Sequence, residues 1–463
     1  MPLLPFLTAD EPVSSLEDYT RRGGGRALER ARALGPEQTA REVNLSGLRG
    51  RGGGGFRTGK KWASVRAAAG SRRFAVCNAA EGEPATFKDR ALIRHNPYQG
   101  VEGLAVAAFV VGADEAFIGT KAKFERERAA LVRAVEEMSA AGLLDGLQVS
   151  VVAGPDEYLF GEEKALLEVI EGHDPLPRVL PPFQHGLFAV GPQLGWEAHE
   201  GHGAAGDAAE PNPTVVNNWE TLANVPHILA RGSEWFRRIG TAESPGTIVC
   251  TVVGDVAGPG VFEVEMGTPL SELLELAGGP LPERTFKAAF SGVANPVLPA
   301  GRFDTALTYE DMRAAGSGLG AGGFAVYDDS ACMVEVSAVL SRFLYVESCG
   351  QCPPCKRDSG EITAALDRLR WGEGGEDEVE LIGARLRTVT DANRCYLGTE
   401  EQLLVSSVLE TFPADFADHL AGFCRLPPRD FVVPKVDDIV DGTVVYDQRQ
   451  PRKQPDWTYA EPV

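Results

Sequence analysis

The chain has no apolar run long enough to cross a membrane. Across its 463 residues the longest near-continuous apolar stretch runs from Leu104 to Val111, far short of the roughly 18–20 residues of a membrane helix. The apolar start has no basic flank and is followed by Asp10 and Glu11, which is unlike a secretory signal. We therefore expect no direct membrane insertion and place the protein in the cytoplasm, within a multisubunit complex.

Basic residues are also scarce. Lysine and arginine total 45 against 66 acidic residues, which gives a formal net charge of -21. Such a chain repels polyanions, so we expect no nucleic-acid partner. Of the eight cysteines, Cys77, Cys250, Cys332 and Cys424 stand singly in apolar surroundings. We interpret these four as small buried hydrophobes in a reducing compartment rather than as disulfide partners.

Histidine is rare, and its one suggestive pair is weak. Among seven histidines, only His199 and His202 have a spacing that could hold a metal, and they lie in a segment, 197–212, that looks inserted. Two histidines without a third ligand are common by chance, so we interpret this segment as a solvated loop.

The length predicts two to four domains. Short apolar runs at 74–77, 116–119 and 149–152 are typical of buried strands, and 121–144 has the spacing of an amphipathic helix. Alternation of strands and helices predicts an α/β domain with a largely parallel sheet. A small α+β unit and a helical bundle follow it. The expected divisions are a lead-in at 1–45, the α/β domain at 46–240, the small unit at 246–328, the helical domain at 335–426 and a tail at 427–463, with a possible hairpin formed by 431–433 and 444–446.

Four cysteines form the first chemical motif. Cys349, Cys352 and Cys355 are separated by two residues each, and Cys395 follows later in the chain. Three thiolates from one tight loop and a fourth from elsewhere suit a [4Fe–4S] cubane. The alternative, a structural zinc site, usually presents two separated pairs of ligands. Four free thiols are a further alternative, disfavoured by the polar residues around them.

A glycine-rich loop, 50–62, forms the second motif. The stretch 49–61 holds five basic residues and no acidic one. Glycines let successive N–H groups point at one anion, and a helix N-terminus after them favours phosphate. The loop matches neither a Walker A sequence nor a standard dinucleotide fingerprint. It therefore predicts a site for a compact anion.

Three polar blocks, 77–89, 158–163 and 213–221, lie at or near predicted strand ends, where α/β sheets bind ligands. Together with the glycine loop and the cysteine motif, their sequences resemble the NADH-oxidising flavoprotein subunit of respiratory complex I. That family includes the diaphorase subunits of NAD-linked hydrogenases and formate dehydrogenases. The resemblance spans about 45–425. It implies FMN in the α/β domain, an SLBB-type β-grasp domain in the small unit and one [4Fe–4S] cluster in the helical domain.

The resemblance also assigns residues. Those it implies for FMN are Gly50, Arg51, Gly52, Gly53, Lys61, Asn78, Glu81, Tyr158, Gly161, Glu162, Val216, Asn217, Asn218 and Thr221. Those it implies for NADH are Phe56, Glu83, Glu163 and Phe183. The implied cluster ligands are Cys349, Cys352, Cys355 and Cys395, and no side chain is expected to act as nucleophile or general base.

Three positions depart from the family pattern. Ala80 stands where an aspartate is usual, Ser64 where an aromatic is expected, and Leu180 where a lysine is expected. These changes remove a stacking partner and a cation from the NADH site and leave most FMN positions intact.

The expected function is an oxidoreductase subunit of the NADH dehydrogenase or diaphorase type, which passes electrons between NAD(H) and a partner redox chain through FMN and the cluster. One alternative keeps both cofactors but exchanges electrons with a non-pyridine carrier or a partner flavoprotein. Another is a scaffold without flavin. The sequence holds one complete cluster motif, so the electrons need a partner. We expect a [2Fe–2S] thioredoxin-like subunit and a catalytic redox subunit, with the tail as a docking strap.

Overall fold

The computed structural model describes residues 6–8, 11–189 and 210–461. The chain forms two compact units. The first comprises Met1–Gly82, Lys88–Val249 and Glu263–Gly267, and the second comprises Glu83–Phe87, Cys250–Phe262 and Thr268–Val463. His199 and His202 lie outside the described residues. In the described part of the chain, none of the helices combines the length and apolar character that a bilayer span requires.

The first unit is an α/β structure. Its strands are β1 Phe74–Ala79, β2 Glu115–Lys121, β3 Gln148–Gly154 and β4 Thr214–Asn218. Its helices are α1 Leu16–Arg21, α2 Arg26–Leu34, α3 Pro36–Ser46, α4 Thr58–Ala67, α5 Lys88–His95, α6 Pro97–Val111, α7 Glu125–Ala140, the 3₁₀ turn η1 Tyr158–Gly161, α8 Glu163–Ile170, α10 Trp219–Arg231 and α11 Ser233–Phe236.

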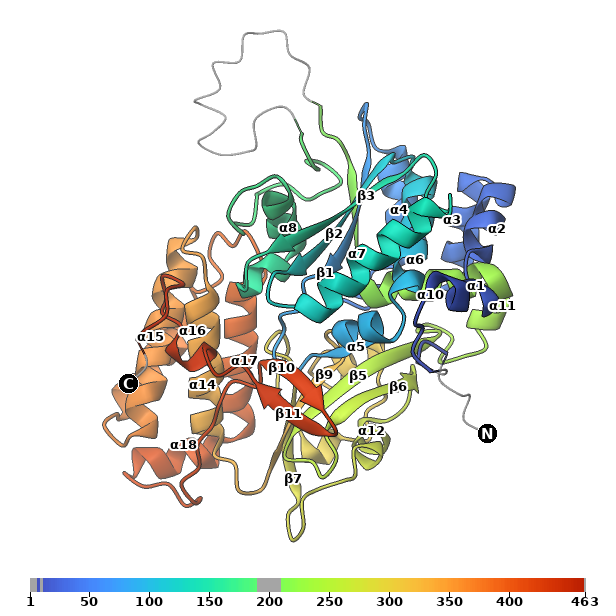
Figure 1. Cartoon of the computed structure of the whole chain (residues 1–463). Coiled ribbons are helices and arrows are strands. Elements are labelled where there is room, and N and C mark those ends of the chain that lie inside the picture. The colour runs from blue at the N-terminus through green and yellow to red at the C-terminus, as the bar shows by residue number, and fades with distance from the viewer. Residues whose placement is uncertain (1–5, 9–10, 190–209, 462–463) are drawn as a thin grey trace, which may run out of the picture. The chain divides into compact units, whose positions relative to one another are not determined.

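The four strands form one parallel sheet in the order β3-β2-β1-β4, part of which is visible in Figure 1. The runs 74–77, 116–119 and 149–152 lie within β1, β2 and β3, so these strand predictions are confirmed. The predicted helix 121–144 was too long, because Lys121 ends β2 and α7 begins at Glu125. The chain passes from β1 outward to β3 and then returns to the other side of β1, which makes the β1–β4 boundary the switch point of the sheet.

Alternate residues of β1 face opposite sides of the sheet. Phe74 and Val76 join a buried cluster with Leu166 and Leu167 of α8. Helix α6 contacts β1 and β2, and it also packs against α10. At that helix–helix contact a Cβ on Gly103 would lie 2.1 Å from the carbonyl oxygen of Leu222, so only glycine allows this approach.

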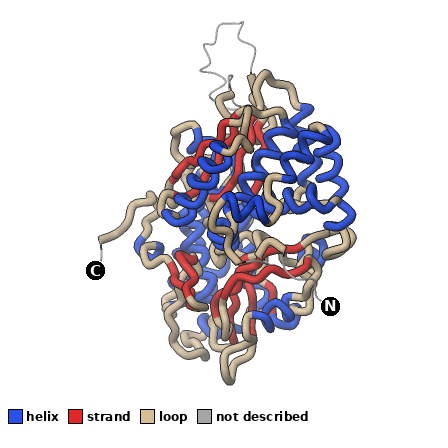
Figure 2. The backbone as a smooth tube through the Cα atoms, turned by 45° about the vertical axis from the view of Figure 1, so that its right-hand side comes forward, coloured by secondary structure: helices blue, strands red, loops and turns tan. Residues whose placement is uncertain are grey.

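The second unit holds a helical group and most of a five-stranded mixed sheet; Figure 2 draws the strands of the chain in red and its helices in blue. The five strands run in the order β6-β5-β9-β7-β8. Their bounds are β5 Thr247–Gly254, β6 Gly260–Glu265, β7 Phe286–Ser291, β8 Leu298–Pro299 and β9 Gly323–Asp328, with α12 Leu270–Leu276, η2 Ala300–Arg302 and α13 Tyr309–Ala314 between them. The helical group consists of α14 Met333–Glu347, α15 Pro353–Arg370, α16 Glu376–Leu386, α17 Leu397–Thr411 and α18 Pro413–Leu420.

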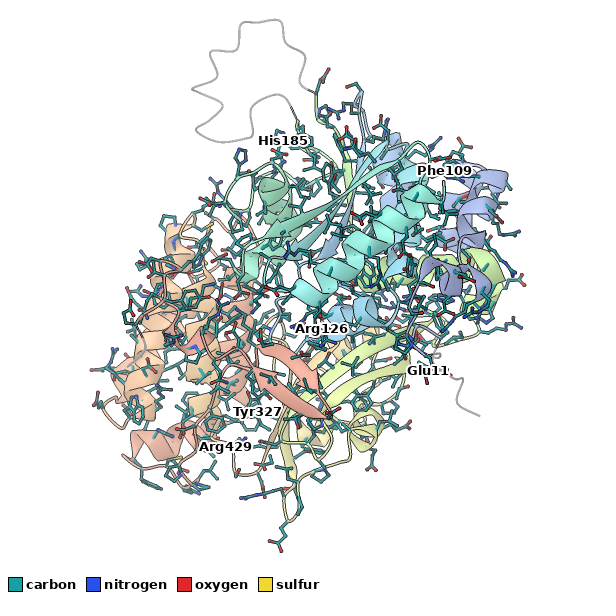
Figure 3. The ribbon with its side chains drawn as sticks, viewed as in Figure 1. Glu11, Phe109, Arg126, His185, Tyr327 and Arg429 are labelled. Atoms are coloured by element: carbon teal, nitrogen blue, oxygen red, sulfur yellow. The ribbon has the colours of Figure 1, made fainter. Side chains whose placement is uncertain are left out.

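The C-terminal tail contains an antiparallel hairpin, β10 Val436–Val440 and β11 Thr443–Tyr446, followed by η3 Gln450–Arg452. The predicted hairpin is present and its second strand lies within β11, but the first strand was placed too early, at 431–433. Arg429, labelled with Tyr327 in Figure 3, donates to Asp255 Oδ2 at 2.8 Å. Further on, Lys453 pairs with Glu347 of α14 at 2.8 Å, with both side chains fully buried. The tail therefore packs against its own unit.

Candidate functional site

The carboxyl ends of β1 and β4 bring two predicted FMN residues together. Asn78 and Asn218 are register partners across the two strands, and Asn217 pairs with Cys77. The two strands flank the switch point of the sheet, and open α/β sheets bind ligands outside the strand ends at such a point. The topology therefore puts these amides where a ligand is expected.

Each of these amides is held by hydrogen bonds. Asn78 Nδ2 donates to the carbonyl of Gly161 at 2.7 Å. Asn217 Oδ1 accepts from Trp62 Nε1 at 2.7 Å. Asn218 Nδ2 donates to Asp89 Oδ2 at 2.6 Å, and its Oδ1 caps α10 by accepting from the backbone N–H of Glu220 at 3.1 Å. Residues from the glycine loop, η1 and the strand ends are thus connected into one region of the first unit.

The glycine loop lies against the end of β4. A Cβ on Gly52 would lie 2.9 Å from Cβ of Asn218, so the loop needs a bare backbone at that point. Arg51 N donates to Thr221 Oγ1 at 2.8 Å. The buried Arg51 guanidinium donates to the backbone carbonyls of Thr247, Arg49 and Pro245. This side chain braces the loop, and three of its five N–H donors bind backbone oxygens.

The loop leads into the N-terminus of α4. No side chain caps this end, and its first turn carries no acidic residue. The Thr58 hydroxyl is buried there and has no hydrogen-bond partner among the described residues. An uncapped helix end with a spare hydroxyl suits a phosphate group. Thr58 was not among the predicted site residues, although a threonine that closely follows a glycine loop and opens a helix is a usable signal for such a site.

These observations fit FMN. The strand-end amides offer donors and acceptors of the kind that a flavin ring needs, while the glycine backbone, the Thr58 hydroxyl and the α4 terminus suit its phosphate. Val216 and Thr221 are buried beside these groups. Gly50 and Gly53 belong to the loop, where Gly53 has a φ of +111°, a conformation that favours glycine. Tyr158 lies in η1.

Several acidic site residues are engaged by the protein itself. Glu81 accepts from Arg90 Nε at 3.0 Å, and burial raises the pKa of its carboxyl despite that cation. Glu162 caps α8 by accepting from the N–H groups of Lys164 and Ala165 at 2.8 and 3.0 Å. Burial raises the pKa of Glu162 to about 7. Glu162 therefore changes charge near neutral pH.

The four residues predicted to contact NADH are distributed over both units. Phe56 and Phe183 are 59% and 47% exposed, which leaves their rings open for stacking. Glu163 pairs with Lys61 of the predicted FMN set at 2.9 Å, at a partly exposed position. Glu83 belongs to the second unit, where its carboxylate accepts from the N–H of Val293 at 2.6 Å.

The positions that depart from the family pattern have ordinary surroundings. Ala80 is fully buried in the cluster formed with Phe160 and Leu166. The Ser64 hydroxyl donates to the carbonyl of Lys60 at 3.0 Å on the surface of α4. Leu180 is partly buried. None of these three side chains supplies the charge or the ring that the family pattern would place there.

A buried ionic group that was not predicted from the sequence contacts Asn218. Lys88 Nζ lies 2.8 Å from Asp89 Oδ1 and 2.7 Å from Glu220 Oε2, and all three side chains are buried. Burial alone would lower the pKa of Lys88, but Asp89 and Glu220 raise it above its usual value. The three residues stand inside the polar blocks that the sequence singled out. Lys88 and Glu220 are far apart in the sequence, so their contact could not be predicted from it.

The four predicted cluster ligands lie in the second unit. Cys349 follows α14, Cys352 is the N-cap of α15, Cys355 lies in the first turn of α15, and Cys395 precedes the N-cap of α17. Gln351 connects the two segments: its Nε2 donates to Cys349 Sγ at 3.8 Å, and its Oε1 accepts from Arg394 at 2.8 Å.

Three of these cysteines are close enough to influence one another electrostatically. The pKa of Cys355 is raised to about 12, first by burial and then by the negative charges of Cys352 and Cys349. A metal that binds Cys355 as a thiolate must therefore supply the free energy needed to deprotonate it near neutral pH. Lys356 lies next to them, and its Nζ donates to the carbonyl of Ser348 at 2.8 Å.

The spacing favours a cluster over a single ion. A tetrahedral zinc would bring thiolate sulfurs to about 3.8 Å of one another, given a Zn–S bond of about 2.3 Å. Among the residues that the structure describes, two groups of three ligand atoms lie within 4.8 Å of one another, and neither contains any of these four cysteines. Four thiolates set wider than a zinc site fit an iron–sulfur cubane.

Comparison with known proteins agrees with this arrangement. Residues 43–227 match the Nuo51 FMN-binding domain, 335–419 match the NADH-ubiquinone oxidoreductase-F iron-sulfur binding region, and 249–289 match the SLBB domain. An NADH-quinone oxidoreductase subunit of Rhizobium meliloti is 38% identical over 420 residues, which cover 88% of this chain and 94% of the relative. The chain belongs to this family of NADH-quinone oxidoreductase subunits.

Relatives of the chain also include hydrogenase components. NADP-reducing hydrogenase subunit HndC of Solidesulfovibrio fructosivorans is 32% identical over 418 residues, covering 88% of this chain and 81% of that one. The crystal structure of an NAD+-reducing [NiFe]-hydrogenase in the H2-reduced state superposes with a TM-score of 0.74 at 29% identity, covering 91% of this chain and 69% of that one.

Membership of the NADH-quinone oxidoreductase family confirms several predictions. The fold class is confirmed: an α/β flavin domain, an SLBB domain and a helical iron–sulfur region. FMN, NAD(H) and a [4Fe–4S] cluster are confirmed as the cofactors, and the chain is a component of an NADH dehydrogenase-type oxidoreductase. The family favours NAD(H) over the non-pyridine carrier of the alternative hypothesis.

Proposed function

We propose that this chain is the NAD(H)-reactive subunit of a larger redox assembly, and that electrons pass between NAD(H) and its partners through FMN in the first unit and the cluster in the second. The observation that carries the proposal is the pairing of Asn78 with Asn218 at the switch point of the sheet, beside the uncapped α4 terminus. FMN supplies a ring that exchanges two electrons with NAD(H) and single electrons with the cluster.

The residues of the chain bind and orient. We propose that Asn78, Asn217 and Asn218 direct their amides at the flavin ring, supported by Trp62 and Asp89. The loop 50–53, Lys61 and the α4 terminus hold the phosphate, with Arg51 bracing the loop from behind. Val216 and Thr221 close the base of the site. Glu81, Tyr158, Gly161 and Glu162 border it through η1 and the end of β1.

The nicotinamide nucleotide is assigned to Phe56, Glu83, Glu163 and Phe183. Two exposed aromatic rings can stack on its planar groups, and carboxylates can accept from ribose hydroxyls. Since no side chain is required to attack the substrate, catalysis in this site consists of orientation. The cluster is assigned to Cys349, Cys352, Cys355 and Cys395, whose thiolates would hold its iron atoms.

We also propose the partners and the location. Electrons that leave the cluster go to a [2Fe–2S] thioredoxin-like subunit and on to a catalytic redox subunit in the cytoplasm. The tail, 427–463, is the proposed docking segment: its hairpin places Val440 and Val445 at the surface, 49% and 42% exposed. The divisions at 1–45, 46–240, 246–328, 335–426 and 427–463 remain our proposed domains.

Anaerobic stopped-flow mixing of the purified complex with NADH tests the function. We expect the flavin absorbance to bleach first and the cluster absorbance to follow. An Asn218→Ala variant should hold less flavin, while Ser64→Ala, on the surface of α4, should match the parent. A flavin that stays oxidised at millimolar NADH would refute the NAD(H) assignment and favour a non-pyridine carrier. Protein that contains iron but no flavin would support the scaffold alternative.

A further inference from the structure

Three metal-ligating side chains meet in the second unit, apart from the cluster cysteines. The ligand atoms of Cys332, His419 and Cys424 all lie within 4.8 Å of one another. Cys332 Sγ is 3.2 Å from His419 Nε2. From the sequence, Cys332 and Cys424 were interpreted as isolated, buried hydrophobic residues. That interpretation was wrong for Cys424, which is exposed, whereas Cys77 and Cys250 are buried as expected.

Secondary structure brings the three residues together. Cys332 is the N-cap of α14. His419 lies in the last turn of α18, and Cys424 follows shortly after that helix ends at Leu420. Two of these residues lie close together in the sequence, but Cys332 stands 87 positions before His419. Spacing in the sequence therefore does not reveal the set.

The histidine is already oriented as a ligand. His419 Nδ1 lies 3.0 Å from the carbonyl oxygen of Leu369 in α15. A carbonyl can only accept, so Nδ1 carries the proton, and in the neutral ring Nε2 then presents a lone pair toward Cys332. Metal-bound histidines commonly have their second nitrogen fixed in this way. Because His419 is 3% exposed, its ring is also confined by packing.

We propose that Cys332, His419 and Cys424 bind a zinc ion. Two thiolates and an imidazole are ligands that zinc prefers, whereas magnesium and calcium prefer oxygen. Bond lengths of about 2.3 Å to sulfur and about 2.0–2.1 Å to nitrogen require a sulfur–nitrogen separation of about 3.5 Å in a tetrahedral site. The present separation of 3.2 Å needs only a small outward movement. A water molecule completes the fourth position at the exposed side.

The zinc would act as a structural tie. It would connect the start of α14 with the end of α18 through Cys332 and His419. The hydrogen bond of His419 with the carbonyl of Leu369 also connects this site with α15. Helix α14 leads into the cluster loop at its other end, and α15 carries Cys355. The site lies at the opposite ends of these helices from the cluster ligands, since Leu369 and Cys332 are far along the chain from the 349–355 loop.

Metal analysis of the anaerobically purified complex, kept in buffer supplemented with zinc before desalting, tests the proposal. We expect one zinc per chain in addition to the cluster iron. X-ray absorption at the zinc edge is not disturbed by iron, and it should show two sulfurs at about 2.3 Å and two light atoms at about 2.0–2.1 Å. Cys424→Ser should lose zinc and keep the parent iron and flavin contents. Phe423→Ala is the matched control, because Phe423 is an exposed neighbour in the same turn that offers no ligand atom.

Parent protein without bound zinc would overturn the proposal, as would zinc retained equally by Cys424→Ser. A Cys332–Cys424 disulfide in zinc-free protein would overturn it in favour of a redox pair. Should Cys424→Ser lose its iron as well, the zinc-edge spectrum of the parent decides: a shell of four sulfurs would refute the two-sulfur site, and a shell of two would support it. Flavin bleaching by NADH is measured separately, so failure of the zinc site and failure of the proposed function are distinguishable.

Discussion

Lys88 provides the sharpest test of how the flavin site is built. Its ammonium group lies between Asp89 and Glu220, and none of the three side chains is more than 5% exposed. Lys88→Met leaves both carboxylates buried without this cation. Removing one member of a buried ion pair costs about 3–5 kcal/mol. At about 1.4 kcal/mol per pKa unit, that cost is large enough for one carboxyl to take up a proton at neutral pH.

The loss should reach the flavin through Asn218. Asp89 accepts from Asn218 Nδ2 at 2.6 Å, and Lys88 itself lies 3.4 Å from Asn218 Oδ1. We expect Lys88→Met to lower the free energy of unfolding, measured with urea, by about 3–5 kcal/mol. The flavin content per chain should fall with it. A second variant, Lys88→Met with Glu220→Gln, removes one carboxylate charge and should recover part of the stability.

Arg72→Met is the matched control, since it also removes a cation from an ion pair, with Glu115, but at positions 47% and 32% exposed. Surface pairs contribute about 0–1 kcal/mol, so this variant should resemble the parent. The reasoning would be refuted if Lys88→Met unfolded within about 1 kcal/mol of the parent and retained its flavin.

Two further predictions concern buried charges of the second unit. Burial raises the pKa of Glu401 to about 8 from a usual value of 4.5, although its hydrogen bond from Ser341 lowers it. The folded chain therefore keeps a proton that the unfolded chain loses, and stability should fall as the pH rises from 4.5 to about 8. Glu401→Gln should flatten this decline in urea unfolding at a series of pH values, and parallel profiles for the two proteins would contradict the pKa assignment. Lys453→Met should cost about 3–5 kcal/mol by leaving Glu347 without its ion-pair partner, and the tail should become sensitive to limited proteolysis; unchanged resistance would show that the tail is held by other contacts.

The sequence, through its motifs and the family resemblance that they carry, determined the fold class and the cofactors, and it predicts the cluster ligands. Strand periodicity, the cysteine spacing and the glycine loop are local patterns, and each reports a local physical requirement: burial on a sheet, three corners of a cubane, or a backbone that can turn around an anion. Boundaries were less accurate where local signals compete. Lys121 continues β2 because its backbone pairs with Gly154 of β3, so the helix predicted from 121 begins later.

The tertiary structure alone decided which distant residues touch. Lys88 reaches Glu220, and Lys453 reaches Glu347, because buried charges must find a counter-charge wherever the fold brings one. Cys332, His419 and Cys424 are likewise brought together only by the packing of α14 and α18. Such contacts depend on how helices and strands pack, and no spacing along the chain encodes them. The chemistry of a site built within one loop is therefore readable in the sequence, whereas a site assembled from separate elements becomes visible only in the folded chain.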